Sequence, residues 1–462
     1  MIKFGTSGWR AIIADEFTFV TVRRVTQAIA NYLQANATSK QIIVGCDTRF
    51  MAEVFAEECA NLLAANGFET YLCDRPTPTP AISYAIRASG AAGAINFTAS
   101  HNPPQYCGMK FSTPDGAPAL PEVTKQIEQE ISKLEGTEIA KPAKGNVKSL
   151  SLVDDYLKEI AAKVDLQAIA AAGLRIAYDP LWGTGRGYLN KALADVGCDV
   201  KMLHDWRDVY FGNRSPEPDA ENIEELKHEV ITGGYNIGLS TDGDADRFGI
   251  LDRDGAFILP NLVIALLADY LAESRGWTNG VARSVATTNM VDRVCARRGI
   301  PVIETPVGFK FIGQLINDDK IYLGGEESAG LSIRGHIPEK DGILACLLVA
   351  EMVAKRGTTI QAMLEKIYTE VGKLVSKRIG VKLTPQLQQA LPEKLASAPE
   401  DFGGRRVKEI NRVDGVKFIF DDDSWMLMRP SGTEPLVRIY AEAESEQDLE
   451  VLIGTGSQYI LS

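Results

Sequence analysis

Short apolar runs alternate with segments of helical periodicity along most of the chain. This alternation predicts parallel sheets built from right-handed βαβ units. When the apolar runs are aligned, a weak repeat of three units appears, each with three strands and a polar loop after the third. The predicted strands are 41–47, 69–73 and 93–97 in the first unit, 174–179, 199–203 and 235–239 in the second, and 281–286, 301–304 and 321–323 in the third. Apolar residues at i, i+3 and i+4 predict helices between these strands, over 54–65, 188–196 and 290–298.

The last part of the chain has a different pattern. Beyond Val381, prolines punctuate polar helices, and three runs at 416–420, 424–428 and 437–442 alternate as half-buried antiparallel strands do. Boundaries are indicated by a linker-like stretch at 134–145, a turn at 251–255 and the change of pattern near 373–381. We therefore predict an α/β protein in which three similar domains with mixed, largely parallel sheets precede a smaller C-terminal α+β domain. The predicted domains cover 1–145, 146–253, 254–373 and 374–462.

Composition narrows the class of protein. The 462 residues are 45% hydrophobic and 24% charged, as in an ordinary globular protein. A net charge of −12 argues against non-specific binding to nucleic acid or to an anionic membrane. Seven scattered cysteines predict neither a disulfide framework nor a zinc site. With no signal-peptide pattern at the start, and no apolar run near the ~20 residues that span a bilayer, we expect a cytoplasmic protein without membrane or nucleic-acid partners.

Ser100 is the first candidate for chemistry. It lies in the segment 98–104, directly after the small apolar run 93–97, and Pro103 and Pro104 prevent a helix from starting there. Ligands of open α/β sheets bind at the carboxyl ends of strands, where this loop is expected. Ser, Asn and Pro are also ordinary turn residues, so the loop considered alone favours a simple turn.

Asp242, Asp244 and Asp246 place three carboxylates on one short loop, an arrangement that favours a bound cation. An EF-hand is excluded because its sixth position would be Arg247, its twelfth Arg253, and a strand-like run follows the loop. Three hard oxygen donors with room for a phosphate oxygen match Mg²⁺. The alternative is a solvated acidic turn.

Two later segments are candidates for binding a phosphorylated sugar. The segment 429–435 and Arg438 combine guanidinium groups, hydroxyls and a glycine turn, and either a phosphate clamp or a plain hairpin turn explains them. Glu326 and Ser328, between glycines, suit carbohydrate hydroxyls, although an exposed acidic turn is the more frequent explanation. Lysines and histidines near these loops can bind anions or transfer protons, but most such residues are solvated.

Five ordered motifs together carry a resemblance to a known family. They are Gly5–Arg10, Thr98–Pro103, Asp242–Arg247, Gly325–Ser328 and Arg429–Glu434. With them the chain resembles the α-D-phosphohexomutase superfamily, the phosphoglucomutases and phosphomannomutases, over essentially its whole length. The resemblance implies three related α/β domains and a fourth domain, flanked by helices and hinged, around a central cleft.

The resemblance also assigns roles to residues. Ser100 would be phosphorylated, and Mg²⁺ would be held by a phosphoserine oxygen together with Asp242, Asp244 and Asp246. Lys110 would transfer a proton, His101 would support it, and Arg10 and Arg247 would contact the transferring phosphoryl group. The substrate-binding residues would be Thr305, Gly308, Lys310, Glu326, Ser328, His336, Lys340, Arg429, Ser431, Gly432, Thr433 and Arg438.

The implied reaction interconverts hexose 1-phosphates and 6-phosphates through a 1,6-bisphosphate intermediate, and glucose 1,6-bisphosphate would also act as activator. The loop that carries Glu326 and Ser328, here called the sugar loop, has a Glu-Glu-Ser form that resembles glucose-type mutases more than phosphoglucosamine mutases. Mannose phosphates remain an alternative substrate. Cys107 stands where an Asn is common, and Ala329 where a Gly is common. We expect sugar phosphates as partners and a monomer or homodimer.

Two other classes of function remain as alternatives. A sugar phosphatase could use an Asp of the 242–246 loop as nucleophile, and it would retain activity without Ser100. A sugar-phosphate sensor would keep the pocket without turnover.

Overall fold

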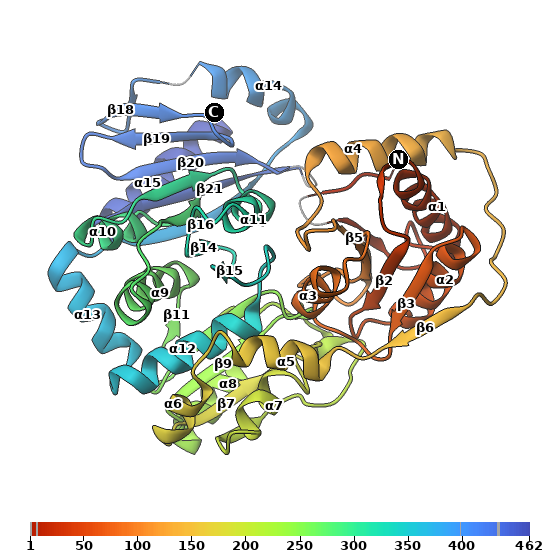
Figure 1. Cartoon of the computed structure of the whole chain (residues 1–462). Helices are drawn as coiled ribbons and strands as arrows, with labels where there is room; N and C mark the ends of the chain where they lie inside the picture. The colour runs from red at the N-terminus through yellow and green to blue at the C-terminus, as the bar shows by residue number, and fades with distance from the viewer. Residues whose placement is uncertain (1, 6–7, 398, 432–434) are drawn as a thin grey trace.

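The structure is a computed structural model that describes residues 2–5, 8–397, 399–431 and 435–462. Four sheets follow one another along the chain, each with its own helices. The N-terminal domain, coloured red and orange, and the blue C-terminal domain lie on opposite sides of Figure 1, and the second and third domains connect them. This architecture confirms the predicted fold class.

The first sheet contains six strands in the order β1-β5-β4-β2-β3-β6. Its strands are β1 Trp9–Ile12, β2 Gln41–Cys46, β3 Glu69–Cys73, β4 Ala94–Phe97, β5 Tyr106–Ser112 and β6 Val147–Leu150, and its helices are α1 Phe19–Asn36, α2 Ala52–Ala65, α3 Thr79–Ser89 and α4 Pro121–Lys133. Strand β6 lies beyond the predicted linker, yet it pairs in parallel with β3 and so completes the first sheet. The exact domain boundaries stay a prediction.

The second and third sheets have the orders β11-β10-β9-β7-β8 and β13-β12-β14-β15. The second domain contains α5 Val153–Ala161, α6 Leu166–Ala171, β7 Arg175–Asp179, α7 Leu189–Ala194, β8 Asp199–Met202, α8 Glu224–Gly233, β9 Ile237–Thr241, β10 Phe248–Asp252 and β11 Phe257–Ile258. The third contains α9 Pro260–Arg275, β12 Val281–Ser284, α10 Met290–Arg297, β13 Val302–Thr305, α11 Phe309–Asn317, β14 Leu323–Glu326, β15 Gly330–Ile333, α12 Gly342–Arg356 and α13 Ile360–Val371.

The three sheets share one topology. In each, the first strand lies between the second and third in parallel, and the chain then returns antiparallel to the third strand, through β5, β10 or β15. The three polar loops predicted from the sequence make these returns. The carboxyl ends of the parallel strands therefore present all three loops at equivalent places, as the aligned repeat predicted.

Two predicted strands end later than the apolar pattern indicated. Strand β9 continues through Ser240 and Thr241 because its polar side chains are satisfied: the Ser240 hydroxyl donates to the Asp179 carbonyl, and Thr241 bonds the Tyr178 hydroxyl. Strand β14 begins and ends later than 321–323 because its last residues pair with β15, Glu326 opposite Gly330. Cross-strand pairing therefore extends strands beyond their apolar cores.

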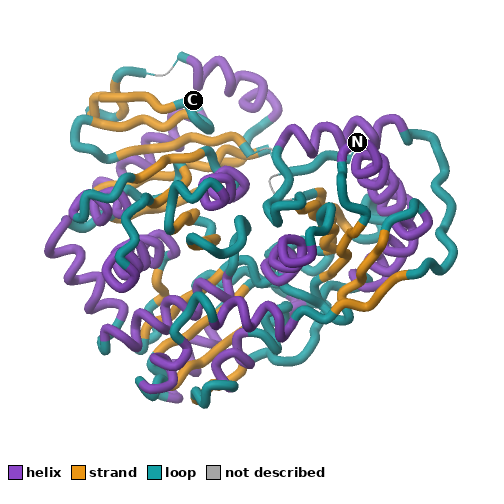
Figure 2. Tube along the Cα trace, in the orientation of Figure 1, coloured by secondary structure: helices purple, strands orange, loops and turns teal. Residues whose placement is uncertain are grey.

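The C-terminal sheet is antiparallel and has the order β16-β21-β20-β19-β18-β17. Its elements are β16 Val375–Lys382, α14 Pro385–Ala396, β17 Asp401–Phe402, β18 Arg405–Asn411, β19 Val416–Phe420, β20 Trp425–Pro430, β21 Leu436–Ala443 and α15 Glu446–Leu461. Figure 2 shows these strands side by side in orange. Helix α15 packs on β16, β20 and β21.

Helix α12 joins the second and third domains. It is buried along most of its length and packs against β9 and β10 of the second sheet as well as β15 and α9 of the third. None of the helices in the described part of the chain is both long and apolar enough to cross a bilayer.

Candidate active site

Ser100 follows β4 in a left-handed backbone conformation, with φ of 51°, and its side chain is almost inaccessible. Its N–H donates to Thr98 Oγ1 at 2.9 Å. Its hydroxyl donates to Asp242 Oδ2 at 2.6 Å, and His101 Nδ1 lies 3.3 Å from the serine hydroxyl oxygen. The serine loop of the first domain thus directly meets the acidic loop of the second.

Arg49 holds the serine loop and was not among the sequence candidates. It is fully buried, and its guanidinium donates to Asp47 Oδ2, which also accepts the Thr98 hydroxyl. It also donates to the carbonyl oxygens of Ser100, Asn102, Pro103 and Tyr106, at 2.6 to 3.0 Å. A signal was available, because Arg49 closely follows the first strand of its unit, at the edge where the other site loops lie.

Asp242, Asp244 and Asp246 converge as the sequence predicted. All three are buried, and a carboxylate oxygen from each lies within 4.8 Å of the others. Thr79 of α3, another residue that the sequence did not single out, donates its hydroxyl to Asp244 Oδ2 at 2.5 Å. Among the described residues, Asp244 Oδ1 and Asp246 Oδ1 are buried without a hydrogen-bond partner. Two orphaned carboxylate oxygens in an all-oxygen cluster fit a hard cation such as Mg²⁺.

Neighbouring charges shift the pKa values of two carboxylates of the cluster in opposite directions. Burial, with repulsion from Asp244 and Asp246, raises the pKa of Asp242 well above its usual range. Burial acts on Asp246 in the same direction, but the ammonium groups of Lys110 and Lys340 outweigh it and lower its pKa. Lys110 Nζ lies 2.5 Å from Asp244 and 2.8 Å from Asp246, and Lys340 Nζ lies 3.0 Å from Asp246. Both predicted lysines are therefore part of the acidic cluster.

Two arginines make the neighbouring space positive. Arg10 donates to Asn102 Oδ1 at 2.6 Å, and Arg247 forms an ion pair with Glu217 at 3.1 Å. The Arg247 Nε group is buried and has no partner within the described part of the chain. Burial and repulsion from Arg247 and Arg10 lower the pKa of His101 well below its ordinary value, so its ring is neutral. An anion beside Ser100 would meet these two guanidinium groups.

The sugar loop places Glu326 at the end of β14. The Gly308 N–H donates to Glu326 Oε1 at 2.7 Å, which links two predicted binding residues. Burial, with repulsion from Glu327, raises the pKa of Glu326 to about 7. Ser328 lines a cavity of about 220 Å³ together with Arg247 of the second domain and Tyr440 of the fourth. Three domains therefore meet at this loop.

The phosphate-clamp candidates lie on neighbouring strands of the last domain. Arg429 of β20 pairs in register with Arg438 of β21, and Arg429 Nε donates to Asp414 Oδ2 at 2.9 Å. The Ser431 N–H donates to the Leu436 carbonyl. Gly432 and Thr433 lie outside the described residues.

The remaining candidates are spread around the third domain. Thr305 ends β13 and donates its hydroxyl to the Pro306 carbonyl. Lys310 lies in the first turn of α11, where burial lowers its pKa. His336 is 2.8 Å from Asp341 and 3.4 Å from Glu159. His336 thus lies between Asp341, the N-cap of α12, and Glu159 of α5, and its part in substrate binding stays a prediction.

Comparison with known proteins decides the family. Models of four phosphoglucomutase/phosphomannomutase domains match the chain: domain I at 1–138, domain II at 154–255, domain III at 260–371 and the C-terminal domain at 386–453. The chain belongs to the phosphoglucomutase/phosphomannomutase family. It is thus an enzyme of the mutase type, an isomerase, as the five motifs predicted.

Its relatives differ in the sugar that they are named for. A phosphoglucomutase/phosphomannomutase of Thermococcus kodakarensis is 30% identical, over 96% of this chain and 95% of the relative. A probable phosphoglucosamine mutase of Methanothermobacter thermautotrophicus is 31% identical, over 96% and 94%. The crystal structure of a putative phosphomannomutase from Thermus thermophilus superposes with a TM-score of 0.88, at 32% identity, covering 100% of this chain and 99% of that one. These relatives support a phosphohexomutase and leave the sugar open.

Proposed function

We propose that this enzyme interconverts glucose 1-phosphate and glucose 6-phosphate through a phosphorylated Ser100 and a glucose 1,6-bisphosphate intermediate. The observation that carries the proposal is the contact of the Ser100 hydroxyl with Asp242 in a buried acidic cluster beside Arg10 and Arg247. In one half-reaction the phosphoryl group leaves the serine oxygen for a sugar hydroxyl. In the other, the sugar keeps that group, and the phosphoryl group that the substrate brought is transferred from the other end of the bisphosphate to the serine oxygen.

Asp242, Asp244 and Asp246 would hold Mg²⁺ together with an oxygen of the phosphoserine. A bound Mg²⁺ would neutralise charge on the transferring phosphoryl group. The chain's own groups position that phosphoryl group: Arg10 and Arg247 would contact its oxygens. Lys110, the predicted proton-transfer residue, lies within the same cluster.

The unreacting phosphate would bind at the clamp of the last domain, and Glu326 and Ser328 would hold the sugar hydroxyls. Glucose is favoured by the Glu-Glu-Ser form of the loop, with mannose, or both sugars, as the alternative and glucosamine as a weaker one. The relatives are named as mutases of glucose, mannose or glucosamine phosphates, so all three sugars are included in the test. The free state of all seven cysteines supports a cytoplasmic location, and we expect a monomer or homodimer.

The test is a coupled mutase assay with glucose, mannose and glucosamine 1-phosphates, in the presence of Mg²⁺ and glucose 1,6-bisphosphate. We expect the highest kcat/KM with glucose 1-phosphate, and one phosphate on the wild-type chain by intact mass. Ser100→Ala should lose nearly all activity together with that phosphate, because no other group carries the phosphoryl between turns. The exposed Ser132 of α4 supplies the matched control, and Ser132→Ala should change neither measurement.

Other outcomes would identify the alternatives. A Ser100→Ala variant that still hydrolyses sugar phosphates would support an Asp-dependent phosphatase. A wild-type protein that binds sugar phosphates without converting any of them would support a sensor. Finding no phosphoserine in an active wild-type enzyme would contradict the proposed cycle.

A further inference from the structure

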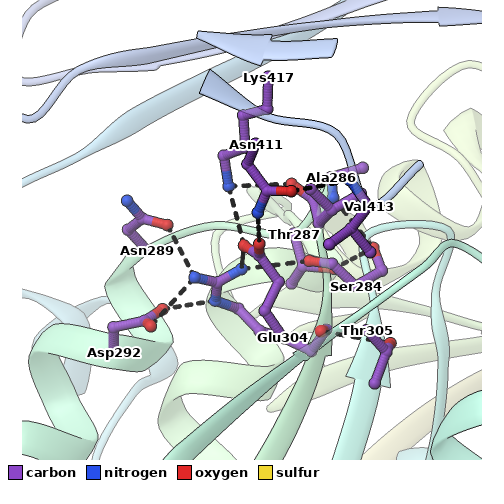
Figure 3. A network of polar contacts seen from close by, with 12 residues as sticks. Ser284, Ala286, Thr287, Asn289, Asp292, Glu304, Thr305, Asn411, Val413 and Lys417 are labelled. Atoms are coloured by element: carbon purple, nitrogen blue, oxygen red, sulfur yellow. Dashed lines mark hydrogen bonds and ion pairs between the residues drawn. The ribbon is translucent and has the colours of Figure 1, made fainter. Parts of the chain in front are cut away.

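The hairpin of β18 and β19 in the last domain contacts residues 304–308 of the third domain. We call these residues the specificity segment because they include Thr305 and Gly308, two of the predicted substrate-binding residues. Asn411 Nδ2 donates to Glu304 Oε1 at 2.5 Å, at the start of that segment. The Val307 N–H donates to Asp414 Oδ2 at 3.0 Å, near its end. Figure 3 shows Asn411 and Lys417 directed at Glu304 from the last domain. The hairpin therefore holds the specificity segment at two points.

Asp414 contacts both the specificity segment and the phosphate clamp, the two parts of the chain that would bind the substrate. The oxygen that accepts the Val307 N–H also accepts Arg429 Nε of the phosphate clamp, at 2.9 Å. The residue after Val307 is Gly308, whose N–H donates to Glu326 of the sugar loop. A continuous path thus runs from the clamp arginine through Asp414 and the peptide 307–308 to the sugar-binding carboxylate.

The local backbone brings Asp414 to this position. Gly415 follows it with φ of 86°, and a Cβ there would lie 2.6 Å from the Met428 carbonyl oxygen. Only glycine lets the turn approach the backbone of β20 this closely, next to Arg429. The Asp414 side chain is 24% exposed, so it is not required to fill a core. A partly exposed carboxylate shared by a guanidinium and a peptide of another domain suits a coupling role better than a packing role.

We propose that Asp414 is a positioning residue that couples phosphate binding at the clamp to sugar recognition by Glu326. The proposal rests on the proposed function, because that function assigns Arg429 to phosphate and Glu326 to sugar. Coupling of this kind is reciprocal: a phosphate at the clamp would favour the Gly308–Glu326 geometry that binds sugar, and sugar would favour phosphate binding. It would make recognition of the hexose depend on its distal phosphate.

The experiment is a double-mutant cycle on binding, read by calorimetry with glucose 1-phosphate. The proteins are the wild type, Asp414→Ala, Glu326→Gln and the double variant. We expect Asp414→Ala alone to weaken glucose 1-phosphate binding by about tenfold, a change typical of a lost charge-assisted contact. We also expect Glu326→Gln to weaken binding at least threefold less in the Asp414→Ala background than in the wild type. Inorganic phosphate binding should weaken clearly less than glucose 1-phosphate binding in Asp414→Ala.

Two controls keep the result interpretable. Asp421→Ala removes an exposed carboxylate from another turn of the same domain and should bind as the wild type does. Asp414→Asn keeps the size of the side chain, and it replaces the alanine variant if thermal unfolding shows that the latter is misfolded. Additive effects of the two substitutions, or equal weakening of inorganic phosphate and glucose 1-phosphate, would overturn the coupling. Failure of the proposed function would be seen separately, as absence of turnover by the wild type, since the binding cycle needs no turnover.

Discussion

Burial and neighbouring charges, more than residue type, determine the charge of single carboxylates in this site. Asp242 and Asp246 lie on the same short loop, yet burial raises the pKa of the first, and two lysines lower that of the second. For Glu326, burial and Glu327 outweigh the opposing charges of Lys340 and Arg247, and its pKa rises to about 7. Its ionisation therefore falls in the range of pH where enzymes are assayed.

The pKa of Glu326 predicts a measurable effect on stability. Its folded pKa of about 7 exceeds the ordinary 4.5, so its contribution to stability is fully present below pH 4.5 and is lost as pH rises through 7. By linkage the loss reaches about 3 kcal/mol near pH 8. Glu326→Gln does not ionise, so we expect its melting temperature to exceed that of the wild type near pH 8 and to match it near pH 4.

Glu122→Gln, at an exposed position of α4, is the control for this comparison. The difference in melting temperature between Glu122→Gln and the wild type should be the same at both pH values. A Glu326→Gln difference that does not change with pH would mean that the carboxyl is not protonated in the folded chain.

At the scale of elements, the start of helix α12 supports the loop that carries Asp242, Asp244 and Asp246. Asp341 caps the helix, accepting the Leu344 N–H at 2.9 Å, and the Gly342 N–H donates to the Ala245 carbonyl at 3.1 Å. A Cβ on Gly342 would lie 2.2 Å from the Arg247 carbonyl oxygen. The helix can approach the loop this closely only because a glycine stands in its first turn.

Gly342→Ala should therefore displace the loop that carries Asp242, Asp244 and Asp246. We expect a loss of about 2 kcal/mol or more in stability from the clash, and at least a tenfold fall in kcat/KM. Gly454→Ala is the matched control, because it also places a methyl group on a helical glycine, but in open space. It should leave activity unchanged and raise stability slightly, by about 0.5 to 1 kcal/mol. An active, equally stable Gly342→Ala enzyme would show that the loop tolerates the displacement.

At the scale of the whole molecule, a buried polar network joins the third and fourth domains. The Glu304 carboxylate forms an ion pair with Arg283 of its own domain at 2.5 Å and another with Lys417 of the last domain at 3.1 Å. Figure 3 shows Lys417 approaching Glu304. Lys417 Nζ also donates to the Val285 carbonyl at 3.0 Å and lies 4.2 Å from the ring centre of Trp425. Because polar contacts in this interface are directional, they fix the last domain in one orientation relative to the specificity segment.

Lys417→Met should weaken this interface while keeping the side-chain volume. It removes the hydrogen bond to Val285 and one partner of Glu304, so we expect a loss of about 1 to 3 kcal/mol and a lower melting temperature. Lys408→Met, in an exposed ion pair of the same domain with Asp423, should change stability by about 0.5 kcal/mol or less. Equal effects of the two substitutions would mean that the buried network adds nothing to docking.

The sequence by itself determined the repeat and the principal loops. Strand positions follow from local apolar spacing, and the Ser100 and Asp242–Asp246 loops are contiguous motifs, so both can be predicted without tertiary contacts. The strand ends at β9 and β14 could not, because cross-strand pairing and the bonds of Ser240 and Thr241 set them.

Only the tertiary structure decided which polar residues support the site. Arg49, Thr79 and Asp414 resemble any solvated loop or helix residue in the sequence, yet they contact partners 51, 165 and 107 residues away. His336 resembles a binding residue but contacts two carboxylates, Asp341 at the start of α12 and Glu159 of α5. The physical reason is that local pattern sets which segments form strands, helices and turns, whereas the role of a charged group depends on its burial and partners, which exist only after the domains pack together.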